Sequence, residues 1–234
     1  MSIYKGTPPI VTDNLVLAFD ALNYESYSGG SGTWFDISKS QINSRLYNGP
    51  TFTTEGKASL LFDGTNEYAE ISFEGNFATT AYTIMFFAKS NVQSALKTFV
   101  GFSDSNAPAG PEAFYCHDIQ QWSGTPNEVL SFVSSGTGYQ YYRFTPNVNL
   151  TDWNFYCEVI TPTTIKTYVN DVVYYDSSDI TARNNFDKIW LGTRGAPSNQ
   201  NLDGYMANFM LFEKEFSHQE VLQNYTSLKS RFGL

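Results

Sequence analysis

Two pairs of closely spaced glutamates are the residues in this sequence that could do acid–base chemistry. The first pair is Glu67 and Glu70, and the second is Glu213 and Glu215. Retaining glycoside hydrolases need two carboxyls about 5–5.5 Å apart, one as nucleophile and one as acid. Glu67 and Glu70 differ by an odd number of positions, so on a strand they point to opposite faces. The second pair lies where a predicted strand runs into a predicted helix. We interpret both pairs as surface carboxylates and predict that the chain is not an enzyme.

Histidines and cysteines are too few for most other catalytic or metal sites. His117 and His218 are the only histidines, and Cys116 and Cys157 are the only cysteines. His117 follows Cys116 directly, which on a strand puts the two side chains on opposite faces and excludes a catalytic dyad. Two histidines cannot hold zinc without carboxylate or thiolate ligands. We predict two free, buried thiols and no catalytic residue.

An aromatic run is the best candidate for a binding site. It is Tyr139-Gln140-Tyr141-Tyr142-Arg143, and Trp122 lies in a loop rich in Gln, Ser and Gly. Alternate residues of a strand share a face, so Tyr139, Tyr141 and Arg143 can line one surface. Exposed rings of this kind stack on the faces of sugars. We predict a glycan-binding site made of Trp122, Tyr139, Tyr141 and Arg143. The alternative is ordinary cross-strand packing of aromatic side chains.

The composition indicates a β-structure with many turns. Aromatic residues make up 17% of the 234 residues and charged residues only 16%, with 17 Gly and 9 Pro. Short runs rich in aromatic and β-branched residues alternate with turn clusters, as in antiparallel sandwiches and barrels. These predicted strands span 15–20, 60–62, 68–73, 82–88, 98–102, 113–116, 129–133, 139–144, 154–160, 164–169, 172–175, 188–192 and 205–212. The length suits one domain with a sizeable core.

Two of these runs predict where their strands lie. Residues 82–88 are almost continuously apolar, which predicts a central strand covered on both faces. Residues 164–169 alternate polar and apolar, as expected for a strand with one face in water. Asn170 and Asp171 follow, and they predict a two-residue hairpin turn into the strand 172–175 because both residue types tolerate a positive φ.

One helix is predicted, at the end of the chain. Ser217 and Glu220 have the spacing of a capping box, with Ser217 as N-cap. Lys229 and Arg231 fall in the predicted last turn, where the helix dipole favours cations. An apolar stripe of helical period predicts that the helix packs on the sandwich; it consists of Val221, Leu222, Tyr225, Leu228 and Phe232.

Charge and the N-terminal sequence exclude further classes of function. The formal net charge is −9 and the isoelectric point is near 4.6, which disfavours partners that are bound through their phosphates. The apolar stretch from Leu15 to Phe19 is too short for a signal peptide or a membrane span. We therefore expect a chain made in a cytoplasm, with no nucleic-acid partner and no membrane insertion.

Short motifs from residue 32 onward follow one another in a recognisable order. They are GTWFDIS (32–38), NGPTF (48–52), LFDGTNEY (61–68), WNFYC (153–157), YVND (168–171), IWLG (189–192), DGYM (203–206) and LFEKEFS (211–217). Together they resemble the laminin-G-like (LamG-like) branch of the concanavalin A-like lectin/glucanase superfamily. The resemblance implies an all-β jelly-roll sandwich of two antiparallel sheets with a C-terminal α-helix. We expect residues 15–234 to form this single domain, behind an N-terminal arm of residues 1–14.

The resemblance also implies a candidate metal site, because many members of this family hold calcium at an edge of the sandwich. Asp63 and Asn66 offer oxygens in a turn, and Asp20 ends an apolar strand. The alternative is a β-turn closed by a hydrogen bond to the Asp63 side chain. Calcium bound by Asp20, Asp63 and Asn66 is thus left open, and no cofactor is required.

Within the family, residues 15–21 and 224–233 most resemble copies found in structural proteins of tailed bacteriophages. This implies a non-enzymatic virion structural or accessory protein, used for capsid decoration or tail adhesion and assembled in the host cytoplasm. The expected partners are other virion proteins, such as coat or tail subunits. Cell-surface polysaccharide of the host and a second copy of the chain are further options. The alternative function is a free-standing carbohydrate-binding lectin, and a glycoside hydrolase ranks third.

Overall fold

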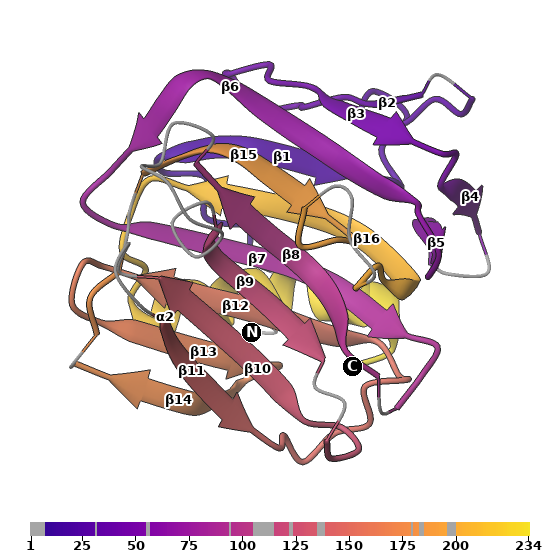
Figure 1. Ribbon diagram of the computed structural model, residues 1–234. Coiled ribbons are helices and arrows are strands. Elements are labelled where there is room, and N and C mark those ends of the chain that lie inside the picture. Colours follow the sequence, from indigo (N-terminus) through magenta and orange to yellow (C-terminus); the bar gives the residue numbers. More distant parts are fainter. Residues whose placement is uncertain are drawn as a thin grey trace, which may run out of the picture.

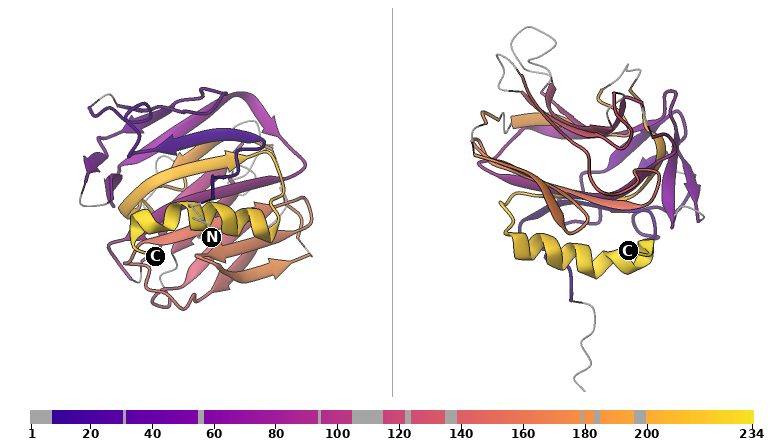
Figure 2. Two further views of the ribbon diagram at one scale, coloured as in Figure 1. Left: turned by 180° about the vertical axis from the view of Figure 1, so that it is seen from behind. Right: turned by 90° about the horizontal axis from the view of Figure 1, so that it is seen from below.

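Two antiparallel β-sheets lie face to face, and a C-terminal helix covers the outer face of one of them (Figures 1 and 2). The computed structural model describes residues 8–234 apart from 31, 55–56, 94, 105–114, 122–123, 135–138, 179, 183–184 and 196–199. Within this part of the chain, each sheet has eight strands. The all-β jelly-roll sandwich with a C-terminal helix that the sequence predicts is confirmed.

Sheet A is the sheet next to the helix. Its strand order is β14–β13–β12–β7–β16–β5–β4, and β1 pairs with the same edge of β16 that β5 occupies. The strands are β1 (Leu15–Asp20), β4 (Thr51–Thr53), β5 (Ser59–Asp63), β7 (Tyr82–Ser90), β12 (Asn154–Ile160), β13 (Ile165–Val169), β14 (Val172–Ser177) and β16 (Asp203–Phe212).

Sheet B is the sheet away from the helix, and it faces the viewer in Figure 1. Its strand order is β11–β10–β9–β8–β15–β6–β3–β2. The strands are β2 (Thr33–Trp34), β3 (Ser44–Tyr47), β6 (Tyr68–Ala78), β8 (Lys97–Ser103), β9 (Tyr115–Gln121), β10 (Val129–Ser134), β11 (Tyr139–Phe144) and β15 (Asn185–Leu191).

The observed strands agree closely with the predicted ones. The predicted strands 15–20, 139–144 and 154–160 coincide with β1, β11 and β12 at both ends. Part of the predicted strand 113–116 lies outside the described residues. The sequence does not predict β2, β3 and β4, because strands of two to four residues are too short to show alternation.

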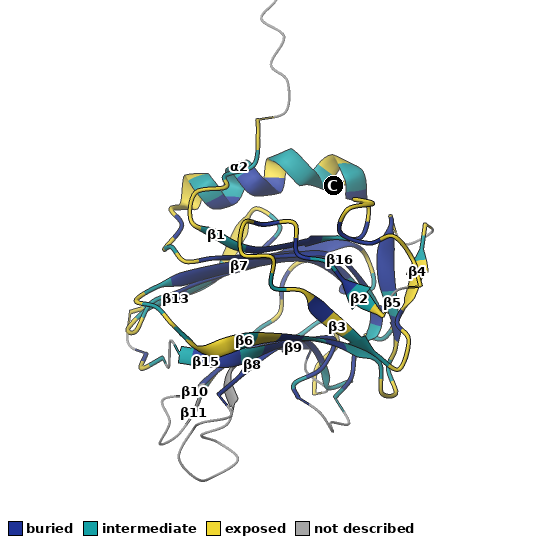
Figure 3. Ribbon diagram, turned by 90° about the horizontal axis from the view of Figure 1, so that it is seen from above, coloured by how far each residue is buried: buried dark blue, intermediate teal, exposed yellow. Residues whose placement is uncertain are grey.

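Strand β7 shows why sheet A is buried on both faces (Figure 3). Tyr82, Ile84 and Phe86 belong to the core between the sheets. Met85 and Phe87 belong to a second core under the helix. Alternate residues of one strand thus meet two different apolar layers, which confirms the prediction of a central strand from its continuous apolar run. The predicted turn at Asn170 is also present, since that residue has a φ of 57° between β13 and β14.

The helix α2 (His218–Leu228) begins with the predicted capping box. The Glu220 N–H donates to Ser217 Oγ at 3.3 Å, and the Ser217 N–H donates to Glu220 Oε2 at 2.9 Å. Lys214 Nζ lies 2.6 Å from Glu220 Oε1, so the glutamate of the capping box also forms an ion pair with Lys214. This hydrogen bond from Lys214 is the main reason why the pKa of Glu220 is lowered from its ordinary value.

Three apolar residues attach the helix to sheet A. Val221, Tyr225 and Phe232 are buried, and Phe232 lies in the short 3-10 helix η1 (Lys229–Phe232) that follows α2. The ring of Phe232 stacks on Phe87 at a centroid distance of 4.1 Å and lies 5.0 Å from the ring of Trp153. The packing of this helix on the sandwich is therefore confirmed.

The rest of the predicted stripe is partly wrong. Leu222 and Leu228 are only half-buried, whereas Asn224 is fully buried. The amide of Asn224 is satisfied by the N-terminal segment, because the Val11 N–H donates to its Oδ1 at 2.6 Å. Lys229 and Arg231, which the sequence places in the last turn of the helix, both belong to η1. A polar residue on the buried face thus ties residues 8–14 to the helix, which apolar periodicity cannot predict.

The GTWFDIS motif has a structural role. Trp34 is fully buried and lies 5.6 Å from Phe19 between ring centroids. The carboxylate of Asp36 accepts hydrogen bonds from the N–H groups of Ala18, Ser38 and Ile42 and from Ser38 Oγ, at 2.8–3.0 Å. One buried carboxylate thus fixes the loop before β3 and joins it to β1.

The buried thiol of Cys157 is free, as predicted. Its burial raises its pKa well above the ordinary value, and the neighbouring Glu158 adds to the rise. The side chains of Cys116 and His117 lie outside the described part of the structure. Among the described residues, no helix has the length and the apolar character needed to cross a membrane.

Candidate functional site

The outer face of sheet B carries the predicted aromatic run. Tyr142 and Phe144 of β11 pack into the core between the sheets, so Tyr141 and Arg143 point to the outer face. Tyr141 is 53% exposed. The ring of Tyr142 on sheet B lies 4.4 Å from the ring of Tyr175 on β14 of sheet A. This contact between the two sheets closes this side of the sandwich. The prediction that Tyr141 and Arg143 share a face is confirmed by their position.

A groove of about 410 Å³ lies where β9, β10 and β11 meet two neighbouring loops. Phe132 of β10 lies directly opposite Tyr141 and forms the floor, since its ring meets the Tyr141 ring edge to face at 5.4 Å. The Arg194 guanidinium lies over the Phe132 ring, 4.6 Å from its centroid. The described lining of the groove is Leu96, Gln120, Leu130, Phe132, Tyr141, Arg143, Arg194 and Gln200.

A glycine positions Arg194 over the groove. The segment after β15 crosses β8 at Gly101, where an added Cβ would lie 2.8 Å from the Arg194 carbonyl oxygen and 2.9 Å from its Cα. Gly101 therefore lets the two backbones approach closely. The Gln200 carbonyl then accepts the Thr98 N–H at 2.8 Å, which attaches the end of this loop to the start of β8.

The groove combines the groups that bind sugars. An exposed ring such as that of Tyr141 offers an apolar face to the C–H groups of a sugar ring, and guanidinium and amide groups offer donors and acceptors to its hydroxyls. Two amides meet at one end, where Gln120 Nε2 donates to Gln200 Oε1 at 3.2 Å. The groove is open to solvent along Tyr141 and Arg143, which are both exposed.

Sequence reasoning found Tyr141 and Arg143 but missed most of the lining. Phe132, Arg194 and Gln200 come from two further parts of the chain and meet the aromatic run only in the folded protein. The one available signal was Gly101 inside a predicted strand, since such a glycine often marks a close backbone approach. Of the other predicted glycan residues, Trp122 lies outside the described residues, and Tyr139 lies on β11 with no side chain described.

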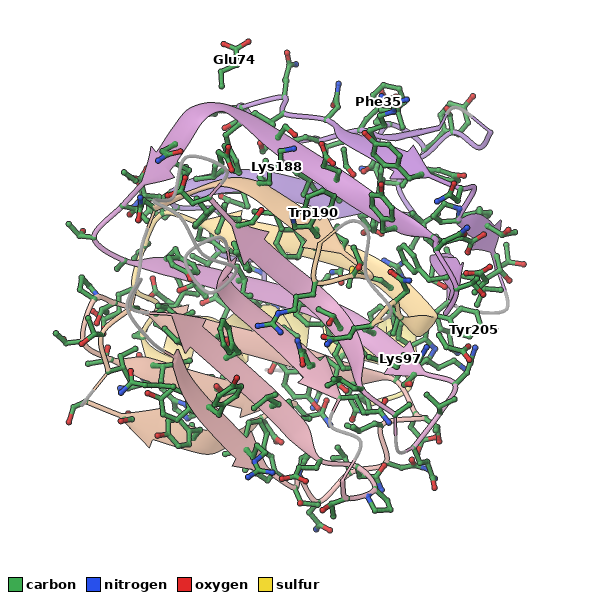
Figure 4. The ribbon with its side chains drawn as sticks, in the orientation of Figure 1. Phe35, Glu74, Lys97, Lys188, Trp190 and Tyr205 are labelled. Atoms are coloured by element: carbon green, nitrogen blue, oxygen red, sulfur yellow. The ribbon has the colours of Figure 1, made fainter. Side chains whose placement is uncertain are left out.

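A second aromatic cluster lies on the same face of sheet B, toward β3. The rings of Tyr47 and Tyr68 stack at 4.6 Å, and the Tyr68 ring lies 5.6 Å from the ring of Trp190. The Trp190 indole N–H donates to Ser103 Oγ at 2.9 Å. Figure 4 shows Trp190 and Lys188 on the side of sheet B that faces the viewer. Trp190 is only 4% exposed, so Tyr47 and Tyr68, which are half-buried, are the more accessible rings.

The candidate metal residues do not form one site. Asp20 lies opposite Asn208 on β16, and Asp63 lies opposite Asp203 on the same strand. These two positions are five residues apart, so the two aspartates are separated by roughly 17 Å along the strand. Calcium ligands lie about 2.3–2.6 Å from the ion. The prediction that Asp20 shares an ion with Asp63 and Asn66 is therefore wrong.

Both aspartates have other partners. Asp63 Oδ1 accepts the N–H groups of Thr65 at 2.8 Å and of Asn66 at 3.4 Å, which is the β-turn alternative. Asp20 Oδ1 pairs with Arg231 Nη1 at 2.7 Å. No cluster of three or more His, Cys, Asp or Glu side chains suited to a metal occurs among the residues that the structure describes. Calcium at the 63–66 turn alone stays a prediction.

The paired glutamates do not face each other. Glu67 Oε2 accepts the Asp63 N–H at 2.8 Å, and Glu70 Oε1 lies 3.6 Å from Lys188 Nζ on the outer face of sheet B. Burial is the main cause that raises the pKa of Glu67. Glu213 and Glu215 are both exposed beyond the end of β16. Neither pair is arranged as a nucleophile and an acid around a common site.

Known structures resemble this fold over nearly the whole chain. The binding domain of botulinum neurotoxin serotype D is 12% identical, with a TM-score of 0.68 over 92% of this chain and 52% of the other. The binding domain of botulinum neurotoxin DC in complex with SialylT is 15% identical, with a TM-score of 0.69 over 93% and 52%. The same toxin domain in complex with rat synaptotagmin II is 14% identical, with a TM-score of 0.68 over 92% and 52%. This chain thus spans about half the length of these domains.

The sequence comparisons give the family. No curated protein sequence matches the chain. The family model described as the concanavalin A-like lectin/glucanases superfamily matches residues 63–222, which is more than half of the chain. This match includes β6 to β16, and so the strands of the groove as well as the start of the helix. The chain therefore belongs to the concanavalin A-like lectin/glucanases superfamily.

Proposed function

We propose that this chain is a non-enzymatic carbohydrate-binding domain whose groove over β9, β10 and β11 holds the sugar. The observation that carries the proposal is the exposed ring of Tyr141 in a groove that also presents Arg143 and Arg194. The fold supports it, because the family includes lectins. One of the similar toxin domains was solved in complex with SialylT, which is a property of that domain.

The test is a glycan array on the purified chain, followed by titration of the best hit. Tyr141→Ala should weaken sugar binding by about tenfold or more, because it removes the stacking face from the groove. It should change the free energy of unfolding by only about 1 kcal/mol, because Tyr141 is an exposed residue.

Tyr24→Ala is the matched control. Tyr24 is 75% exposed and does not line the groove, so its loss should leave sugar binding unchanged. An array without any hit, or a Tyr141→Ala variant that binds as tightly as the parent chain, would contradict the proposed function.

We also propose that the domain acts on the particle of a tailed phage, as a capsid decoration or tail adhesion protein assembled in the host cytoplasm. The motif resemblance at 15–21 and 224–233 supports this role, and the free thiol of Cys157 agrees with assembly in a reducing compartment. In this role the partners are coat or tail subunits as well as a host polysaccharide.

Mass spectrometry of purified particles tests the virion role. The chain should be present in the particles at a constant ratio to the major coat protein. Its absence from particles, together with sugar binding by the free chain, would leave the free-standing lectin as the function.

A further inference from the structure

The start of the described chain lies against α2 (Figure 2). We call residues 8–11 the strap, and we call the helix side chains that hold it, those of Gln223, Asn224 and Ser227, the seat. Asn224 binds both main-chain groups of Val11: the Val11 N–H donates to Asn224 Oδ1 at 2.6 Å, and Asn224 Nδ2 donates to the Val11 carbonyl at 3.5 Å. One carboxamide thus pairs with the strap as a neighbouring strand would.

The other seat residues also bind the main chain of the strap. Gln223 Nε2 donates to the Pro9 carbonyl at 2.7 Å, and Ser227 Oγ donates to the Pro8 carbonyl at 2.6 Å. Ile10 and Val11 add apolar contacts with the core under the helix. Recognition through main-chain hydrogen bonds and an apolar anchor is how proteins bind extended segments in trans. The strap of one copy therefore fits the seat of another copy as well as its own.

The seat is unfavourable when it is empty. Asn224 is fully buried, and apart from Val11 the described partner of its carboxamide is Met85 Sδ, which Nδ2 contacts at 3.3 Å. If the strap left, the Oδ1 acceptor would stay buried without the Val11 N–H, and such a group destabilises the fold. A strap that leaves its seat is therefore favoured to be replaced by another strap.

A tight turn joins the strap to β1 and can act as a hinge. The Leu15 N–H donates to the Thr12 carbonyl at 3.2 Å, and Asn14 inside this turn has a φ of 56°. This left-handed conformation is disfavoured for residues with a side chain, although Asn tolerates it better than most. An exposed ion pair between Asp13 and Lys214 at 3.2 Å also holds the turn closed, and exposed pairs contribute little. Opening the turn thus releases Asn14 at a small cost in contacts.

We propose that two copies of this chain exchange straps, so that each seat binds residues 8–11 of the other copy. Exchange keeps every contact between strap and seat and changes only the turn 12–15, which is the low-cost route to a dimer. A flexibly linked segment is present at its own seat at about millimolar effective concentration. Exchange is therefore favoured where copies are crowded together, and the strap stays on its own chain in dilute solution.

Exchange leaves the proposed sugar site free. The strap and the seat lie on the helix side of sheet A, whereas the groove lies over β9, β10 and β11 of sheet B. Two copies joined by their straps thus present two grooves on one particle, and two linked sites bind a repeating ligand more tightly than one. The exchange itself does not depend on what the groove binds.

The first experiment asks which chain fills each seat. Pro9 is exposed, so Pro9→benzoylphenylalanine puts a photoreactive group on the strap of the full chain without removing its carbonyl. Light and heavy-isotope-labelled chains are mixed, illuminated and digested, and the cross-linked peptides are read by mass spectrometry. At about 1 mM, pairs of a strap peptide and an α2 peptide should include heavy–light pairs, whereas at about 10 µM nearly all should be of one isotope.

The second experiment changes the hinge and leaves the strap and the seat intact. Asn14→Val should favour the open turn, because a β-branched residue is poorly suited to positive φ, whereas Asn14→Gly should favour the closed turn. The dissociation constant of the dimer, measured by light scattering, should be about tenfold or more lower for Asn14→Val than for Asn14→Gly. The heavy–light fraction should follow the same order, with the parent chain between the two.

Three results would overturn the proposal. The first is cross-linked pairs of one isotope only at about 1 mM, in a chain that unfolds cooperatively like the parent. The second is a dimer whose strap peptides link only to their own α2, because that dimer forms through another surface. The third is an equal dimer constant in the parent and in Asn14→Gly, a comparison that needs no destabilising variant. Sugar binding enters neither readout, so each of these results would leave the proposed function standing.

Discussion

Replacing Phe232 by Ala should be among the most damaging single changes on the helix side of the protein. Phe232 is 6% exposed, so nearly its whole side chain is removed from water on folding. Burial of such a side chain contributes about 1.5–3 kcal/mol, and the ring contacts with Phe87 and Trp153 add about 0.5–1.5 kcal/mol. We expect a loss of about 3 kcal/mol in the free energy of unfolding, at the lower end of the range for Phe→Ala.

The loss is measurable by thermal unfolding. In a domain of this size, 1 kcal/mol corresponds to about 2–4 °C in Tm, so Tm should fall by about 6–12 °C. Phe52→Ala is the matched control, because it deletes the same atoms from a ring that is 38% exposed and contacts Tyr27. It should cost about 1 kcal/mol. Equal losses in the two variants would refute the reasoning that burial under the helix determines the cost.

Two further predictions test the helix cap and the groove. The pKa of Glu220 is lowered chiefly by Lys214, so the stabilisation from this carboxylate is present above its unfolded pKa and is lost as pH falls through its folded pKa. Glu220→Gln should therefore lower the free energy of unfolding by about 1 kcal/mol near neutral pH and by almost nothing near pH 3, as measured by urea titration of the variant and the parent chain. A difference between the two chains that does not depend on pH would contradict the ion pair. Gly101→Ala should displace the backbone at Arg194, lowering stability by about 1–3 kcal/mol and weakening sugar binding, and unchanged binding would show that the groove does not depend on this close approach.

Strands and helix were predictable where a residue and its near neighbours decide the structure. The apolar run 82–88 and the capping box at Ser217 each lie within a few residues of sequence, and both predictions are confirmed. The run 164–169 predicted its strand correctly, but the prediction that one face lies in water is wrong, because Tyr168 is 1% exposed and packs in the core under the helix. The helix stripe was only half right, because the N-terminal segment supplies a polar partner for Asn224 from more than 200 residues away. The paired glutamates do not share a site, but strand parity is not the reason, because Glu67, Glu213 and Glu215 lie outside strands β6 and β16.

The candidate sites depended on contacts that no local pattern encodes. The sequence alone determined that Tyr141 and Arg143 share a face of one strand. Only the tertiary structure brought Arg194 over Phe132, because that contact needs β15 beside β8 and a glycine where the chain crosses. Likewise, only the register of β1 and β5 along β16 separates Asp20 from Asp63. Side-chain periodicity fixes which way a residue points, whereas strand order and register, which are set by packing over the whole sandwich, fix which residues meet.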